Sequence, residues 1–228
     1  MQRYSKRNRI ISKILLASLI FSLTPGESSA EEGQLSQKYQ MVSEPEVVYE
    51  NKIISGKRSQ NFNEGWKFYL GDLGNAESSN FNDSSWRNIN LPHDYSIEQN
   101  YSKAMEAESA YLPGGTAWYR KTFFIDSSYK GKVINLDFDG VYMNASVYIN
   151  GKKLGMHPYG YTPFSFNLTD NLNYDGENTI AVKVDHKTPS SRWYSGSGIY
   201  RDVELRVTDP IHIDKDGIKI EAKNLKST

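Results

Sequence analysis

Short runs in which apolar and polar residues alternate recur along most of the chain. In the segment KVINLDFDGV, Ile134, Leu136 and Phe138 fall on one side of an extended chain, and the polar residues between them fall on the other. Beyond the first thirty residues, no stretch of useful length has apolar residues at helical spacing. Many short strands separated by turn residues are typical of an all-β sandwich. We expect strands within residues 61–72, 84–92, 115–125, 132–141, 143–157, 162–172, 176–186 and 199–207.

Two turn signals fix how some of these runs connect. Asn150-Gly151 lies between alternating segments, and this pair favours the type I′ turn of a hairpin because both central positions need positive φ. Asp175-Gly176 marks a second turn. After Pro210, the segment IHIDKDGIKIEAKNL alternates again, so we expect residues 210–228 to form the first strand or strands of another module.

The first thirty residues have the order of a secretory signal peptide. A cationic start, MQRYSKRNRIISK, precedes the apolar run ILLASLIFSL, and the small residues of ESSA offer a cleavage site after Ala30. The apolar run is short for a membrane span, so we favour secretion over an uncleaved anchor and expect no membrane contact after cleavage. Residues 31–55 are polar with little periodicity and are interpreted as a linker.

Composition narrows the possible chemistry. The 228 residues carry 27 basic and 27 acidic side chains, so no basic excess predicts a nucleic-acid partner. The absence of cysteine excludes disulfides, zinc–thiolate sites and a cysteine nucleophile, and we expect no cofactor. Export without cysteine favours a secreted or cell-surface bacterial protein, in particular a Gram-positive one. The 16 tyrosines are numerous, and their rings combine a flat apolar body with a polar tip that suits sugars.

Polar and aromatic residues gather at two predicted strand ends. The segment LPHDYSIE places His93, Asp94 and Glu98 directly after a strand, where sandwich domains present functional side chains. The alternative is that Asp94 only caps a turn through its own backbone. The segment SRWYSGSGIYRDV places Trp193 and Tyr194 before a Ser/Gly-rich turn, where they could stack on a ligand or seal the edge of the sandwich.

Three other groups of residues could have either a structural or a functional role, and the structural role is the stronger interpretation. Of Trp118 and Tyr119, neighbours on one strand, we expect one to enter the core and the other to point away from it. The loop GMHPYGYTPFSF, with His157, Tyr159 and Tyr161, is either a ligand loop or an aromatic connection. Asp137 and Asp139 share a strand face, and two carboxylates about 5–5.5 Å apart could run a retaining glycosidase mechanism; solvated surface acids are the stronger interpretation. The four histidines have no metal-binding spacing.

A collinear set of motifs resembles the N-terminal domain of glycoside hydrolase family 2, which includes β-galactosidases, β-glucuronidases and β-mannosidases. Each motif alone is weak, but their order over about residues 56–208 is specific. The variants LPHDY and PGGTAWYRK look most like the secreted bacterial β-galactosidase branch. The motifs are FNEGWKF, WRNINLPHD, WYRKTF, DFDGV, VYINGKKLG, GYTPFSFNLT, ENTIAVKV and RWYSGSGIYRDV.

The resemblance implies a galactose-binding-like jelly-roll β-sandwich over residues 56–209, with residues 210–228 beginning a truncated immunoglobulin-like sandwich. It also implies that both catalytic glutamates belong to a (β/α)₈ barrel outside these residues, so that this chain has no catalytic residue and should not hydrolyse glycosides by itself. The implied partners are a β-galactoside and that barrel.

By motif position, Asp94 would hold a sugar hydroxyl, with His93, Trp193 and Tyr194 as further candidate substrate-binding residues. Some β-galactosidases have an alkali-metal-binding Asp near the aromatic pair; Arg192 stands there in this chain, so no metal site is expected. Two other hypotheses remain: a free-standing carbohydrate-binding module and a purely structural domain.

Overall fold

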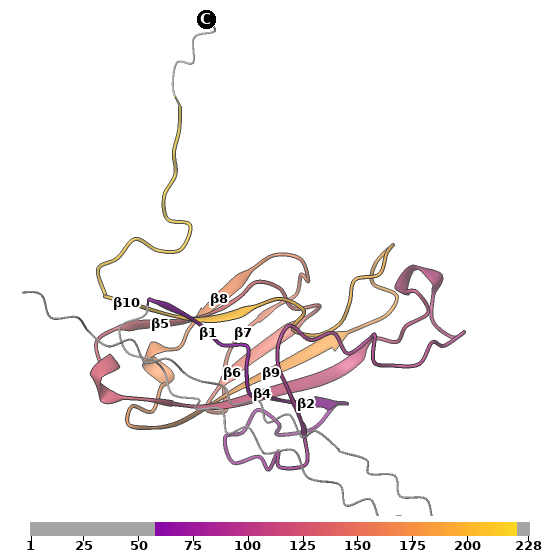
Figure 1. Ribbon diagram of the computed structural model, residues 1–228, viewed down its shortest axis with the longest axis horizontal. Coiled ribbons are helices and arrows are strands. Elements are labelled where there is room, and N and C mark those ends of the chain that lie inside the picture. The colour runs from indigo at the N-terminus through magenta and orange to yellow at the C-terminus, as the bar shows by residue number, and fades with distance from the viewer. Residues whose placement is uncertain (1–57, 223–228) are drawn as a thin grey trace, which may run out of the picture. The chain divides into compact units, whose positions relative to one another are not determined.

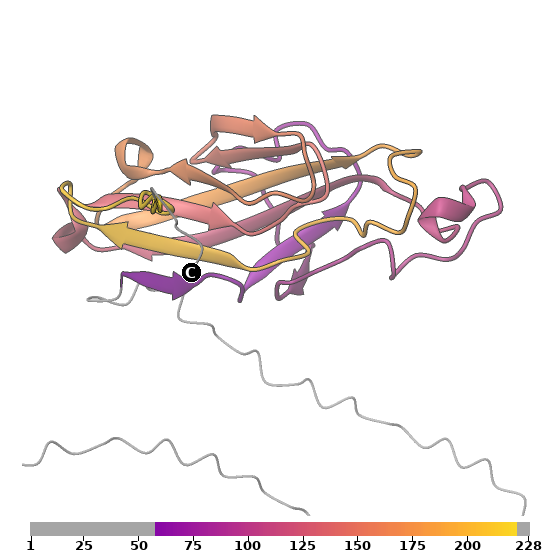
Figure 2. The same cartoon turned by 90° about the horizontal axis from the view of Figure 1, so that it is seen from above.

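The computed structural model describes residues 58–222, which form a sandwich of two antiparallel sheets (Figures 1 and 2). The strand order is β1-β10-β5-β8 in the four-stranded sheet and β3-β2-β4-β9-β6-β7 in the six-stranded sheet. The all-β sandwich is therefore confirmed, whereas the expected signal peptide (1–30) and linker (31–55) lie outside the described residues. The strands are β1 Ser59–Asn61, β2 Trp66–Leu70, β3 Arg87–Ile89, β4 Gly115–Ile125, β5 Val133–Phe138, β6 Ala145–Ile149, β7 Lys152–His157, β8 Phe164–Asn167, β9 Gly176–His186 and β10 Val203–Thr208.

The core lies between the two sheets and follows the alternation of the sequence. On β5, Ile134, Leu136 and Phe138 are fully buried among the side chains of the opposite sheet. The longest pairing joins β4 to β9 over eleven residue pairs. Three single-turn 3₁₀ helices lie in the connections: η1 Ala107–Ser109, η2 Ser127–Tyr129 and η3 Thr169–Asn171.

The β6–β7 hairpin has the predicted two-residue turn. Asn150 and Gly151 have φ angles of 50° and 81°, so both occupy the left-handed region that a type I′ turn requires. The side chain of Asn150 reinforces the turn, because its Oδ1 accepts the amide of Thr179 on the neighbouring strand at 2.9 Å.

A long connection covers the outer face of the six-stranded sheet. Tyr119 enters the sandwich core as expected for one of the pair, but Trp118 is also buried, beneath residues 71–86. Arg120 holds this connection down: its Nε donates to Asp83 at 2.7 Å and its Nη1 to the carbonyl of Ala76 at 2.5 Å. The two rings thus point to opposite faces of β4 as expected, and a second apolar layer on the outer face buries Trp118 as well.

Asp137 lies on the outer face of β5, but it is not solvated. Its side chain is only 1% exposed and forms an ion pair with Arg206 of β10, whose Nε lies 2.9 Å from its Oδ2. Burial acts to raise the pKa of Asp137, but the hydrogen bonds from Arg206 and Ser165 outweigh it and hold that pKa below its usual value. Asp139, at the end of the same strand, remains exposed. Asp137 is thus committed to a structural ion pair, which argues against a catalytic carboxylate pair.

Residues 211–222 form no strand within the described part of the chain. The apolar side chains of this segment are exposed, Ile211 to 95%. Polar contacts attach its first half to the four-stranded sheet, including Arg58 Nη2 to the Ile213 carbonyl at 3.0 Å and Arg206 to Asp214 at 3.2 Å. That residues 210–228 begin an immunoglobulin-like sandwich stays a prediction.

Candidate sugar-binding site at one end of the sandwich

Two loops meet at one end of the sandwich. Residues 90–114, between β3 and β4, and residues 187–202, between β9 and β10, lie side by side in both views of the ribbon (Figures 1 and 2). Their backbones pair directly, since the amide of His93 donates to the Ile199 carbonyl at 2.8 Å and that of Tyr95 to the Ser197 carbonyl at 3.1 Å. The two segments singled out in the sequence, LPHDYSIE and SRWYSGSG, thus form one structural unit.

Asp94 fastens these two loops together. Its Oδ1 accepts the amide of Ser96 at 3.0 Å, which closes an Asx turn, and the amide of Ser197 at 2.8 Å. Its Oδ2 accepts the hydroxyl of Tyr194. The turn-capping alternative for Asp94 is therefore correct as far as Oδ1 is concerned. Only Oδ2, shared with the half-exposed Tyr194, remains on the side from which a sugar hydroxyl could approach.

The glycines of the turn permit this close approach. Gly196 has a φ of 74°, and a Cβ there would lie 2.9 Å from Oδ2 of Asp94. Gly198 has a φ of 103°, and a Cβ there would overlap the hydroxyl of Tyr119. Both glycines have a left-handed backbone and an atom of another residue too close for a Cβ. The two glycines of Ser-Gly-Ser-Gly are therefore needed for the close packing of the two loops, and not merely for flexibility.

His93 points into the domain, away from solvent. Its Nδ1 lies 2.7 Å from the hydroxyl of buried Tyr119, and its Nε2 lies 3.0 Å from Nη2 of Arg87 and 3.2 Å from Oε1 of Glu98. Because an arginine N–H can only donate, Nε2 of the neutral ring accepts from Arg87, and Nδ1–H donates to Tyr119. Burial lowers the pKa of His93, against the opposing charge of Glu98. Both ring nitrogens have partners within the protein, so His93 supports the loop that carries Asp94.

A second buried histidine, which the sequence did not single out, supports the other loop. His186, at the end of β9, has Nδ1 2.5 Å from Oγ of Ser197 and Nε2 2.9 Å from Oγ of Ser190. The hydroxyl of Tyr142 also reaches Ser190, at 3.1 Å. Burial lowers the pKa of His186. One imidazole therefore links both ends of the loop that presents Trp193 and Tyr194.

Trp193 extends from that loop and is 61% exposed. Its indole Nε1–H donates to the hydroxyl of Tyr161 at 2.8 Å. Tyr161 belongs to the loop between β7 and β8, which the sequence left open as a ligand loop or an aromatic connection. The structure thus brings together two segments that the sequence separates by about thirty residues.

The residues described by the structure contain no group of three or more His, Asp or Glu placed to hold a metal ion. None of the helices formed by residues 58–222 has the length and apolarity needed to cross a membrane.

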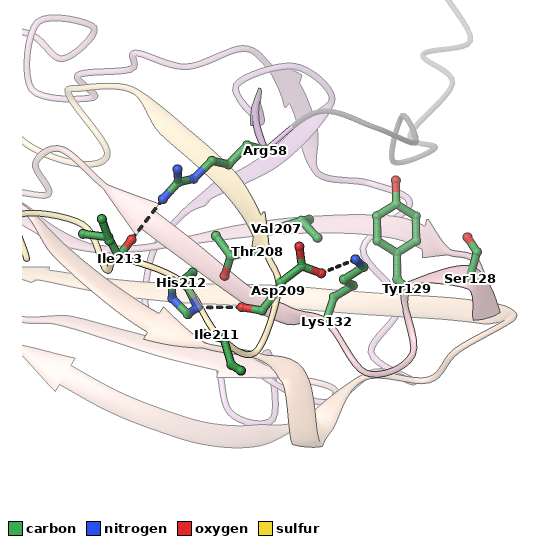
Figure 3. Close-up of a pocket in the computed structure, with 10 residues that line it drawn as sticks. All are labelled: Arg58, Ser128, Tyr129, Lys132, Val207, Thr208, Asp209, Ile211, His212 and Ile213. Carbon is green, nitrogen blue, oxygen red and sulfur yellow. Dashed lines mark hydrogen bonds and ion pairs between the residues drawn. The ribbon is translucent and has the colours of Figure 1, made fainter.

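A hollow on the described surface lies elsewhere (Figure 3). It has a volume of about 640 Å³ and lies at the end of the four-stranded sheet where β10 leads into residues 209–213. Figure 3 shows Lys132 turned toward Asp209 and Arg58 toward the backbone of Ile213, so the charged groups at this hollow are engaged with each other and with the backbone. None of the four predicted site residues lines it.

Comparison with known proteins agrees with this fold. The chain matches the family model described as glycosyl hydrolases family 2, sugar binding domain, over residues 60–210. It is 47% identical over 166 residues to a β-galactosidase of Bacteroides ovatus, covering 72% of this chain and 20% of that protein. It is 36% identical over 178 residues to a β-glucuronidase of Formosa agariphila, covering 71% and 18%.

Solved structures give the same result. A β-glycosidase from Bacteroides vulgatus superposes with a TM-score of 0.67 at 50% identity, covering 69% of this chain and 21% of that one. A glycosyl hydrolase family 2 member from Bacteroides cellulosilyticus gives 0.68 at 44% identity, with the same coverage of both chains.

These matches identify residues 60–210 as the non-catalytic sugar-binding domain of a glycoside hydrolase. The chain belongs to glycoside hydrolase family 2, as the resemblance indicated, and corresponds to the N-terminal domain of its members. It spans about one fifth of the length of the relatives named above.

Proposed function

We propose that this chain is the sugar-binding domain of a secreted bacterial family 2 enzyme that hydrolyses β-galactosides. The observation that carries the proposal is the match over residues 60–210, with a named β-galactosidase 47% identical across it. The sequence variants LPHDY and PGGTAWYRK support the galactosidase branch over the glucuronidase branch. The cationic and apolar start of the chain supports secretion.

In this function the chain contributes binding and shape, and the bond-breaking acids belong to another domain of the enzyme. Asp94 presents Oδ2 beside Tyr194, where a carboxylate can accept a charge-assisted hydrogen bond from a sugar hydroxyl. Displacement of the Tyr194 hydroxyl by the sugar would exchange one hydrogen bond for another, with Oδ1 still anchored by two backbone amides.

The product of the native gene tests this function. Purified from culture supernatant, it should release nitrophenol from 4-nitrophenyl β-galactoside much faster than from the β-glucuronide. The 228-residue chain alone should release none from either. Preference for the glucuronide would overturn the proposed specificity, and turnover by the 228-residue chain would overturn the assignment of catalysis to another domain.

A further inference from the structure

Three aromatic rings from two loops lie together near Tyr194, which pairs with Asp94; those of Tyr159 and Trp193 are exposed, and that of Tyr161 between them is partly buried. Trp193 lies next to Tyr194 in the chain, and its ring centre is 6.4 Å from that of Tyr161. The ring of Tyr159, which is 56% exposed, lies 5.5 Å from Tyr161. We call Tyr159, Tyr161 and Trp193 the aromatic platform.

The platform is held in place from below. Tyr161 packs edge-on against buried Tyr142 at 5.3 Å. Between the two tyrosines of the loop, Gly160 lies against the Tyr142 ring, where a Cβ would overlap it, and its carbonyl accepts the hydroxyl of Tyr200 at 2.7 Å. Rings fixed before a ligand arrives lose little conformational entropy on binding, which favours affinity.

The polar tips of Trp193 and Tyr161 are engaged with each other. The indole N–H of Trp193 is used by Tyr161, so this ring offers a ligand its flat apolar side. The two loops, KTPSSRWYSGSG and HPYGYTP, contain no aliphatic Leu, Ile, Val or Met side chain. The large exposed apolar side chains of these two segments are the rings of Tyr159, Trp193 and Tyr194. Such rings suit a partner that is itself part apolar and part hydroxylated, and a pyranose ring has that character.

We propose that the aromatic platform binds the sugar unit adjacent to the one held at Asp94, so that this domain selects β-linked galacto-oligosaccharides over single sugars. This inference rests on the proposed function and extends it. It commits to a galactose unit as occupant, because the proposed substrate is a β-galactoside, Trp193 directly precedes Tyr194 in the chain of a sugar-binding domain, and the exposed Tyr159 and Trp193 rings offer stacking faces.

Binding to the 228-residue chain tests the proposal without any hydrolysis. Tryptophan fluorescence and NMR titrations with galactose, β-1,4-galactobiose and β-1,4-galactotetraose should give affinities that rise with chain length. Trp193→Ala should weaken galactotetraose binding by about tenfold and abolish the dependence on length, since a lost stacking contact of about 1.4 kcal/mol corresponds to that factor. Tyr161→Phe, which removes the acceptor for the indole N–H, should give a smaller loss.

Phe124→Ala is the matched control, because Phe124 is an exposed aromatic of β4 outside the platform; it should bind as the parent chain does. Equal binding by the Trp193→Ala variant, absence of any length dependence, or preference for a uronic-acid oligosaccharide would each overturn the proposal. Hydrolysis of nitrophenyl β-galactoside by the native gene product is measured separately. A negative binding result would therefore reject the platform proposal without rejecting the proposed enzyme function, and a negative hydrolysis result would reject the enzyme function.

Discussion

The two oxygens of the Asp94 carboxylate have different roles: Oδ1 stabilises the loops, and Oδ2 can accept a ligand hydroxyl. We expect Asp94→Ala to lower the free energy of unfolding by about 2–3 kcal/mol, because the buried amide of Ser197 loses its acceptor. Tyr194→Phe removes only the hydrogen bond at Oδ2 and should cost about 1 kcal/mol. Urea unfolding of both variants measures the difference. Equal losses would show that the two oxygens do not have the separate roles assigned to them.

Lys121 is a buried cation with little compensation. It is 5% exposed, donates to the carbonyl of Glu64 and lies 4.3 Å from the centre of the Phe62 ring. Burial lowers the pKa of Lys121 to about 8. Because the unfolded chain binds this proton more tightly, the free energy of unfolding should rise with pH from about 8 to about 10, by about 2 kcal/mol.

Lys121→Met provides the control for that rise. Methionine fills a similar volume without a titrating group, so the variant should be more stable than the parent chain near neutral pH and flat over the same range. Urea denaturation at several pH values measures both. An unchanged slope in the variant would assign the pH dependence to another group.

The residues of the site show where sequence reasoning stops. Asp94, Trp193 and Tyr194 could be selected because each lies in a short motif at a strand end. The contacts of these residues could not be predicted in the same way. The hydrogen bond from Trp193 to Tyr161, for example, joins two loops that are distant in the sequence and adjacent only in the folded domain. His186 was missed for the same reason: its two serine partners follow it in the chain, but the folding of the loop back over the ring is a tertiary feature.

The β6–β7 hairpin is an element whose local sequence specifies its geometry. We expect Gly151→Ala to destabilise the chain by about 1 kcal/mol, because its φ of 81° is unfavourable for a residue with a Cβ. The nearest atom to such a Cβ is 3.7 Å away, so strain and not collision sets the cost. Gly74→Ala is the matched control, since no atom lies within 4 Å of its Cβ position; it should change stability by less than about 0.5 kcal/mol. Thermal unfolding compares them, and equal effects would contradict the turn argument.

Strands were more predictable than the surfaces that cover them. Alternation located β4, β5, β9 and β10, because one face of each strand packs in the core. It could not reveal that residues 71–86 cover Trp118, or that Arg206 buries Asp137. In both cases the outer face of a sheet is buried by side chains from segments distant in the sequence. The alternation of apolar and polar residues along a strand shows only that its two faces differ in polarity, and not what covers each face.

The whole domain should lose stability on acidification in two separate ranges. Burial lowers the pKa of His93 and of His186 below the ordinary value of 6.5. Between those lowered values and 6.5 the unfolded chain binds more protons than the folded one, so the free energy of unfolding falls as pH drops below 6.5 and levels off once both forms are protonated. The pKa of Glu98 is held below 4.5 by Arg87 and His93, and those of Asp83 and Asp137 are held below 3.8 by their basic partners, so a second fall begins near pH 4.5. Urea unfolding at closely spaced pH values should resolve two steps.

His186→Gln should shrink the first step and leave the second. Because His186 links both ends of the loop that presents Trp193, its protonation should also loosen the aromatic platform. Galactotetraose affinity is therefore expected to decline over the same pH range as the first step in the parent chain. A first step that persists in full in His186→Gln would show that this imidazole does not couple proton binding to the loop.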